Sequence, residues 1–141
     1  MCNKFTEYGT VFAVGGLGYG FLEVAFRGFT HWTMLLTGGA CFSFMYAADR
    51  LLPKTRLWAK ALVCGVAVTE IEFIVGCLVN KICHMGVWDY SDRFSNIAGQ
   101  ICPEYSLLWV AVSLPALQLS RALRNRLSGK NQKNAVRNGT V

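Results

Sequence analysis

Four long apolar stretches constrain the fold of this chain more than any other feature of its sequence. Each approaches the roughly 20 residues that a helix needs to cross a hydrocarbon core about 30 Å thick. Because these stretches are apolar nearly all round, they are typical of membrane-spanning helices and not of the surface helices of a soluble bundle. They cover Tyr8–Phe26, Trp32–Ala48, Leu57–Val79 and Ile101–Leu119.

The composition agrees with a membrane protein. Hydrophobic residues make up 53% of the chain, and its mean hydropathy is +0.34, which is high for a soluble protein of 141 residues. The first apolar stretch is long, contains Glu23 and lacks a small-residue cleavage site, so we expect it to be retained rather than removed as a signal peptide. We therefore predict an all-α, integral membrane four-helix bundle over residues 1–120 and a basic, partly disordered cytoplasmic tail over residues 121–141.

The net charge of +6 is compatible with a nucleic-acid partner, but the positions of the basic residues instead predict an orientation in the membrane. With the N-terminus inside, eleven of the 14 Lys and Arg residues fall on the inner side and only Arg27, Lys81 and Arg93 on the outer side. Such an excess is typical of cytoplasmic segments. We predict a plasma-membrane protein with both termini cytoplasmic, surrounded by membrane lipids. The basic tail from Arg121 is interpreted first as a topology anchor, with attraction to anionic lipid headgroups as the alternative.

The connections between the apolar stretches differ in length. The segment Arg27–His31 is so short that the first two helices should pack directly as a hairpin. The third and fourth helices are joined by the longer outer segment Asn80–Gln100. Pro103 suits the first turn of the last helix, where backbone donors are unpaired, whereas Pro115 lies deeper and should kink it.

Small residues recur at a spacing of four within three of the helices. This pattern predicts faces where membrane helices approach closely. Whether these faces close a monomer or join subunits is left open by one chain, although we expect a homo-oligomer. The small residues are Gly16 and Gly20 in the first helix, Gly39, Ser43 and Ala47 in the second, and Ala61, Gly65 and Thr69 in the third.

Acidic residues within a span cost free energy and call for a partner or a cavity. Glu23 precedes Arg27 by four residues, so we expect these two side chains to interact. Glu70 and Glu72 lie about 200° apart around a helix and cannot face one site. We favour Glu72, because it shares a face with Gly65 and other small residues, and leave Glu70 as a partner or second-interface contact.

Several further polar residues fall on the predicted outer side. Trp88 and Tyr90 suit the membrane interface. If a helix begins near Ser95, the side chains of Asn96 and Gln100 share one face of it. The functional interpretation is an outward-facing cleft, and the alternative is a self-satisfied network that fixes helix register. The predicted pathway-lining residues are Glu23, Arg27, Glu72, Trp88, Asp89, Tyr90, Asn96 and Gln100, with Glu70 and Glu104 secondary.

Several motifs together resemble a known family. They are His31-Trp32-Thr33-Met34, Glu72-Phe73-Ile74-Val75-Gly76, Trp88-Asp89-Tyr90-Ser91-Asp92 and Asn96-Ile97-Ala98-Gly99-Gln100-Ile101-Cys102. From about Gly15 to Leu119 the chain is similar to the small bacterial membrane proteins called ABC-transporter type IV, or ABC transporter permeases. This resemblance implies a transport role. The chain has no Walker A sequence, so any ATPase would be a separate subunit.

Three functions follow from these observations. The first is a transporter or channel component, acting as an oligomer, in which Glu23, Arg27 and Glu72 line a polar pathway. The second is a membrane-embedded enzyme on a lipid or lipid-linked substrate, with Glu72 or Asp89 as acid or base. The third is a holin-like or accessory assembly subunit. No catalytic set, metal site or cofactor is predicted, and a disulfide between Cys83 and Cys102 is left open.

Overall fold

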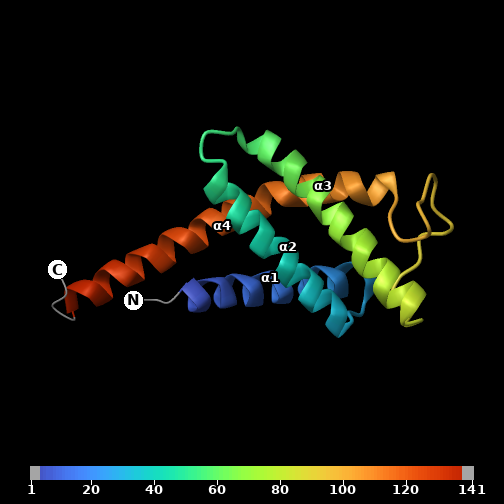
Figure 1. Ribbon diagram of the computed structural model, residues 1–141, viewed down its shortest axis with the longest axis horizontal. Helices are drawn as coiled ribbons and strands as arrows, with labels where there is room; N and C mark the ends of the chain where they lie inside the picture. Colours follow the sequence, from blue (N-terminus) through green and yellow to red (C-terminus); the bar gives the residue numbers. More distant parts are fainter. Residues whose placement is uncertain (1–3, 138–141) are drawn as a thin grey trace.

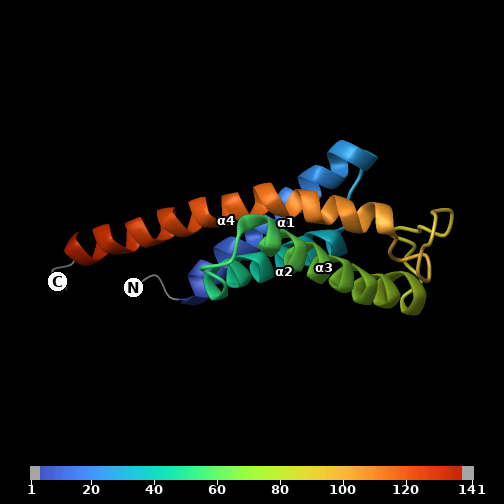
Figure 2. The same ribbon diagram turned by 90° about the horizontal axis from the view of Figure 1, so that it is seen from above.

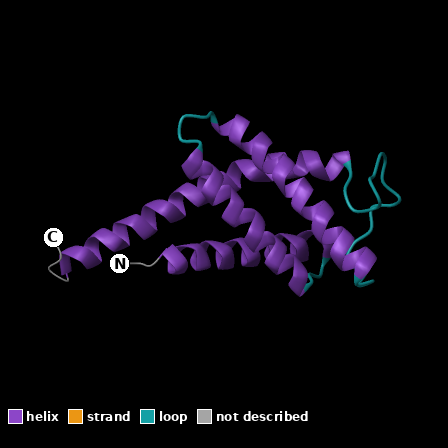
Figure 3. Ribbon diagram, in the orientation of Figure 1, coloured by secondary structure: helices purple, strands orange, loops and turns teal. Residues whose placement is uncertain are grey.

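The computed structural model describes residues 4–137, with side chains through Gly129, and the described part is helical apart from its connections (Figure 1, Figure 3). The predicted all-α class and the four predicted helices are confirmed. Helix α3 ends in a π-helical extension, η1. The elements are α1 (Lys4–Arg27), α2 (Trp32–Leu51), α3 (Leu57–Gly76), η1 (Cys77–Ile82) and α4 (Pro103–Arg137).

Three helical segments are long and apolar enough to cross a membrane. They cover Lys4–Arg27, Leu57–Ile82 and Pro103–Gly129. Helix α2, which contains the second predicted span, is not among them. It contacts α1, α3 and α4 and buries side chains along its whole length, from Thr33 to Asp49. Other side chains of α2, among them Leu36 and Phe44, are exposed.

Glycines bring α1 and α2 into close contact, as the spacing of small residues predicts. A Cβ on Gly16 would lie 2.6 Å from the backbone oxygen of Leu35. A Cβ on Gly38 would collide with the Cβ of Tyr19 in the same way. The two helices are joined by a short connection in which Gly28 has a φ of 80°, a conformation that favours glycine. The predicted direct hairpin is therefore confirmed.

Helices α3 and α4 form the second closely packed pair. A Cβ on Gly65 would collide with Val110 of α4. The main core between the helices includes the fully buried side chains of Val11, Tyr46, Cys64 and Leu117. Helix α4 begins at Pro103, two residues after the predicted start at Ile101, with the proline in its first turn as expected. Figure 1 shows the helix changing direction along its length, as expected of a helix that contains Pro115.

The basic segment that follows the last apolar stretch is a continuation of α4. The helix runs without interruption through Arg137, and residues 138–141 of the predicted tail lie outside the described part. The beginning of α1 and the end of α4 lie at one end of the molecule, and the segment that precedes α4 lies at the other (Figure 1, Figure 2).

No helix begins near Ser95, so the conditional placement of Asn96 and Gln100 on one helical face is wrong. The backbone there turns instead: Ser95 and Ala98 have φ values of 51° and 55°, and Ile97 and Ile101 form an isolated antiparallel bridge. Left-handed backbone at non-glycine residues is incompatible with a right-handed helix.

Candidate functional site

Glu72 lies at a junction of three helices. Its residue exposure is 2%, and its carboxylate accepts hydrogen bonds from two aromatic side chains. The indole Nε1 of Trp109 on α4 donates to Oε2 at 2.6 Å, and the hydroxyl of Tyr19 on α1 donates to Oε1 at 3.3 Å. The expectation that Glu72 faces a helix interface is confirmed, whereas its two partners were not predicted.

The two partners of Glu72 also contact each other. The rings of Tyr19 and Trp109 are stacked, with centroids 5.4 Å apart and planes at 23°. Both rings line a partly open cavity of about 290 Å³ between α1 and α4. Its other lining side chains include Leu22, Cys41 and Val68, and the lining is almost entirely apolar. Glu72 therefore lies directly behind an aromatic wall of this cavity.

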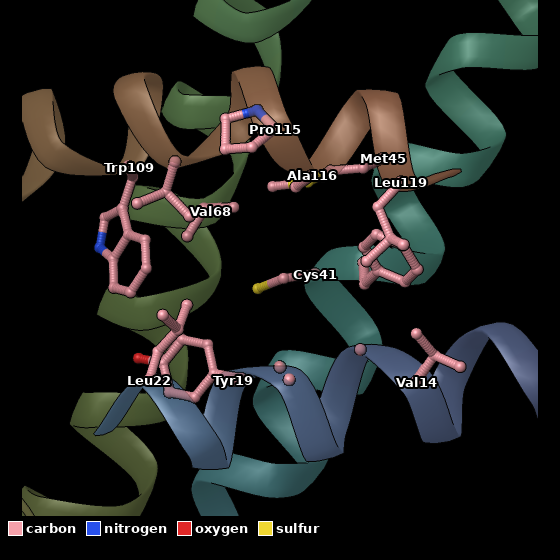
Figure 4. A pocket seen from close by; sticks show the side chains of 15 residues that line it. Val14, Tyr19, Leu22, Cys41, Met45, Val68, Trp109, Pro115, Ala116 and Leu119 are labelled. Atoms are coloured by element: carbon pink, nitrogen blue, oxygen red, sulfur yellow. The ribbon is translucent and has the colours of Figure 1, made fainter. Parts of the chain in front are cut away.

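Figure 4 shows how the cavity is built. Helix α4 carries Trp109 and Pro115 along one side, and α1 carries Tyr19 and Val14 along the other. The sulfur of Cys41 on α2 points into the space between them. Because α1 and α4 make few direct contacts, the space between them is not filled by their own side chains. An apolar body fits such a space, and the two aromatic rings with the carboxylate hydrogen-bonded to them favour a positive charge at that end.

Glu23 and Arg27 form the predicted ion pair, with Nη1 of Arg27 3.0 Å from Oε1 of Glu23. The hydroxyl of Thr30 donates to the other carboxylate oxygen at 2.7 Å. Arg27 also reaches the segment between η1 and α4, where its Nη2 donates to the backbone oxygen of Val87 at 2.8 Å. This pair therefore connects the end of α1 to the segment between η1 and α4, and its charges are paired within the protein.

Trp88 and Gln100 are buried, with exposed fractions of 5% and 4%. They are held together by Asn80, which sequence reasoning did not select. The Asn80 amide donates to the backbone oxygen of Trp88 at 3.0 Å and to Oε1 of Gln100 at 2.8 Å, and its own oxygen accepts from the Val87 backbone at 2.7 Å. The Trp88 indole donates to the Gln100 backbone oxygen at 3.1 Å. These bonds fold the segment between η1 and α4 back onto η1.

Asp89 and Asn96 shape turns at the surface of the same segment. The exposed Asp89 carboxylate accepts from the Ser91 backbone at 2.9 Å, and the hydrogen bonds from Ser91 hold the pKa of Asp89 below its usual range. Asn96 donates to the backbone oxygen of Arg93 at 2.9 Å and accepts from Gly99 at 3.0 Å. Both side chains form hydrogen bonds with neighbouring backbone groups and so stabilise the local turns.

The remaining predicted residues lie apart from the cavity. Tyr90 stacks on Tyr105 at 4.6 Å between ring centroids. Glu104 is exposed and pairs with Arg93 at 3.2 Å, and Glu70 is exposed on α3. None of the predicted pathway residues lines the cavity itself, and of them Glu72 alone is hydrogen-bonded to residues that do. Tyr and Trp side chains in apolar surroundings need a partner for their polar ends, and this rule makes Tyr19 and Trp109 candidate partners of an acidic residue within a span.

A second buried carboxylate, Asp49, was missed by sequence reasoning. Its side chain is 1% exposed and lies among three cations. Its oxygens are 2.7 Å from Nζ of Lys60, 3.0 Å from Nη2 of Arg121 and 2.8 Å from Nη2 of Arg124. The sequence signal was an acidic residue at the end of an apolar stretch, beside basic residues that were interpreted only as topology signals.

Among the described residues, no group of three His, Cys, Asp or Glu side chains is arranged to hold a metal ion. Cys83 is exposed and Cys102 is buried, and both are free thiols, so the disulfide left open by the sequence is not formed in this structure.

Comparison with known proteins points to one family. A family model described as "Putative ABC-transporter type IV" matches residues 8–139, which is nearly the whole chain. Neither the search of curated proteins nor the search of solved structures found a match.

Proposed function

Because the chain belongs to the family described as "Putative ABC-transporter type IV", and three of its helical segments can cross a membrane, we propose that it is a permease-like component of a membrane transporter. The solute binds in the cavity between α1 and α4, and its binding depends on Glu72. The protein lies in the plasma membrane with both termini cytoplasmic and works as an oligomer, with any ATPase as a separate subunit.

The burial of Glu72 is the observation that supports this proposal most strongly. Two neutral donors, Trp109 and Tyr19, hold its carboxylate, and no salt bridge to it occurs among residues 4–129. Arg27, the basic residue in the last turn of α1, is paired with Glu23. A carboxylate inside a membrane protein without a basic partner costs free energy, and such residues are typical of solute and ion pathways.

The surroundings of Glu72 favour one class of solute. The cavity lining is apolar, so an apolar body is stabilised by burial. Tyr19 and Trp109 are part of this lining, and aromatic rings attract cations, an attraction to which the carboxylate hydrogen-bonded to both residues would add. We therefore expect an apolar solute that carries a positive charge to bind more tightly than an anionic one of the same size.

The alternatives receive less support from the same contacts. Of the two residues considered as acid or base for a membrane-embedded enzyme, Asp89 holds a turn through Ser91, and Glu72 is buried. The glycine contacts between α1 and α2 that an assembly subunit would need are made within the chain. We favour transport over both.

Equilibrium binding to the protein in nanodiscs tests the proposal without an energy source. The probes are radiolabelled decyltrimethylammonium and decyl sulfate, which share an alkyl chain and differ in the sign of their charge, with protein-free nanodiscs subtracted. The wild type should bind the cation in preference to the anion. Glu72→Gln should weaken cation binding by about tenfold or more, since it removes the charge and keeps the shape.

Glu70→Gln is the matched control, because it removes an identical charge from the exposed face of the same helix. It should leave cation binding unchanged. Equal binding of the two probes by the wild type, or equal losses in the two variants, would contradict the role of Glu72.

A further inference from the structure

The cluster around Asp49 is separate from the cavity between α1 and α4 and joins three helices. Asp49 lies in the last turn of α2, Lys60 in the first turn of α3, and Arg121 and Arg124 on α4. One carboxylate oxygen accepts from Lys60 Nζ at 2.7 Å and from Nε and Nη2 of Arg121 at 3.0 Å each. The other accepts from Arg124 Nη2 at 2.8 Å.

The charges of this cluster do not balance. Three cationic side chains surround one carboxylate, and the neighbouring Arg50 has its own partner in Glu7 at 3.1 Å. Lys60 and Asp49 are both buried, with side chains 2% and 1% exposed, so these two opposite charges balance each other inside the protein. The surplus positive charge therefore lies on Arg121 and Arg124, which have no second carboxylate among the described residues. The cluster is therefore short of negative charge.

A polar pocket of about 490 Å³ opens on the cluster. The side chains of Arg121 and Arg124 are 40% and 30% exposed, so both guanidinium groups reach it. Their bonds to Asp49 use Nε and Nη2 of Arg121 and Nη2 of Arg124, and the described side chains supply no acceptor for the other nitrogens. Two arginine forks with donors to spare match the oxygens of a phosphate group. The pocket is lined by Asp49, Arg50, Pro53, Lys60, Arg121 and Arg124.

We propose that this pocket is a binding site for a phosphate group, supplied by an anionic lipid headgroup or by a free phosphate anion. The pocket lies where α2 ends, α3 begins and the apolar part of α4 has passed, which is where headgroups meet a membrane protein. The site is distinct from the solute cavity. Its ligand is an anion that pairs with the surplus positive charge around Asp49, whereas the solute proposed for the cavity is a cation attracted by Glu72.

Thermal unfolding of the full chain in a neutral maltoside detergent tests the site. The probes are short-chain phosphatidylglycerol, short-chain phosphatidylcholine and inorganic phosphate, with sodium chloride at equal ionic strength as the reference. The wild type should be stabilised by phosphatidylglycerol more than by phosphatidylcholine or chloride. Stabilisation by inorganic phosphate as well identifies a free anion as ligand, whereas stabilisation by phosphatidylglycerol alone identifies the lipid.

Arg124→Gln should weaken this response by about tenfold in apparent affinity, because a charge-assisted pair is lost. Arg126→Gln is the matched control: it removes the same charge from an exposed position on the same helix and should keep the response. No stabilisation of the wild type beyond chloride, or equal losses in the two variants, would overturn the proposal.

Asp49→Asn separates ligand binding from damage to the fold. It removes the internal anion, so the three cations should depend on the external one, and stabilisation by the anion should exceed that of the wild type. If Asp49→Asn is unfolded without the ligand and folds when the phosphate ligand is added, that result also supports the site. A response to the anion no greater than that of the wild type would contradict the site.

Discussion

Glu72 and Asp49 are both buried carboxylates, and their surroundings differ in charge. Glu72 accepts from two neutral aromatic donors, whereas Asp49 is held by Lys60 and two arginines. Glu72 could be selected from the sequence because it interrupts an apolar stretch. Asp49 also stands at the end of an apolar stretch, but its partners on α4 could not be predicted, because they are more than seventy residues away and a single sequence does not show which distant cations meet it.

Replacing Asp49 by alanine should destabilise the protein strongly. Lys60 would remain buried without its partner, and breaking one half of a buried ion pair typically costs about 3–5 kcal/mol. The free energy of unfolding of the purified protein in detergent micelles measures this loss. Asp92→Ala removes a carboxylate that is 81% exposed and should change stability little. Similar losses in the two variants would contradict the account of the cluster.

At the scale of the helices, the sequence predicts contacts better where they depend on small residues. The close approach of α1 and α2 follows from glycines at regular spacing. The segment between η1 and α4 was less predictable, because Ser95 and Ala98 adopt left-handed backbone that their residue types do not favour. Its fold depends instead on Asn80, whose three hydrogen bonds join positions far apart in the segment.

Gly16→Ala should force α1 away from α2, because its Cβ would lie 2.6 Å from a backbone oxygen that cannot move alone. The expected loss is about 1–3 kcal/mol of the free energy of unfolding. Gly9 lies on the same helix with nothing within 4 Å of its position for a Cβ, so Gly9→Ala should be neutral or stabilising. If unfolding in detergent shows no difference between the two variants, the packing of α1 on α2 is wrong.

Asn80→Ala should loosen the segment between η1 and α4, since the variant leaves the Val87 backbone donor and the Gln100 side chain without their partner. Hydrogen exchange followed by mass spectrometry should show faster exchange over residues 83–102. Lys81→Ala, at the exposed neighbouring position, serves as the control and should leave exchange unchanged. Equal exchange rates in the Asn80 variant and the wild type would contradict the structural role of Asn80.

At the scale of the whole molecule, the number and order of helices follow from the apolar stretches, because length and hydropathy are local properties. The contacts of α2 with all three other helices do not follow from these local properties. Helix α2 is similar in length to a span, yet it is not among the three segments apolar enough to cross a membrane. The cavity could not be predicted from the sequence either, because it forms between α1 and α4, which are far apart in the chain.

The proposed orientation predicts which thiols are accessible from outside the cell. In a variant that keeps Cys83 alone, a membrane-impermeant maleimide should label intact cells, because this residue is exposed and lies on the predicted outer side. A cysteine-free variant carrying Gly129→Cys should be labelled only after the cells are permeabilised. The reverse pattern would invert the topology.

The most direct test of the transport proposal is exchange of a cation across a membrane. Proteoliposomes loaded with unlabelled decyltrimethylammonium should take up the radiolabelled cation faster than protein-free liposomes, without an energy source. Glu72→Gln should abolish this difference, and Glu70→Gln should preserve it. Wild-type exchange no faster than in protein-free liposomes, or undiminished exchange in Glu72→Gln, would contradict a solute pathway through the cavity beside Glu72.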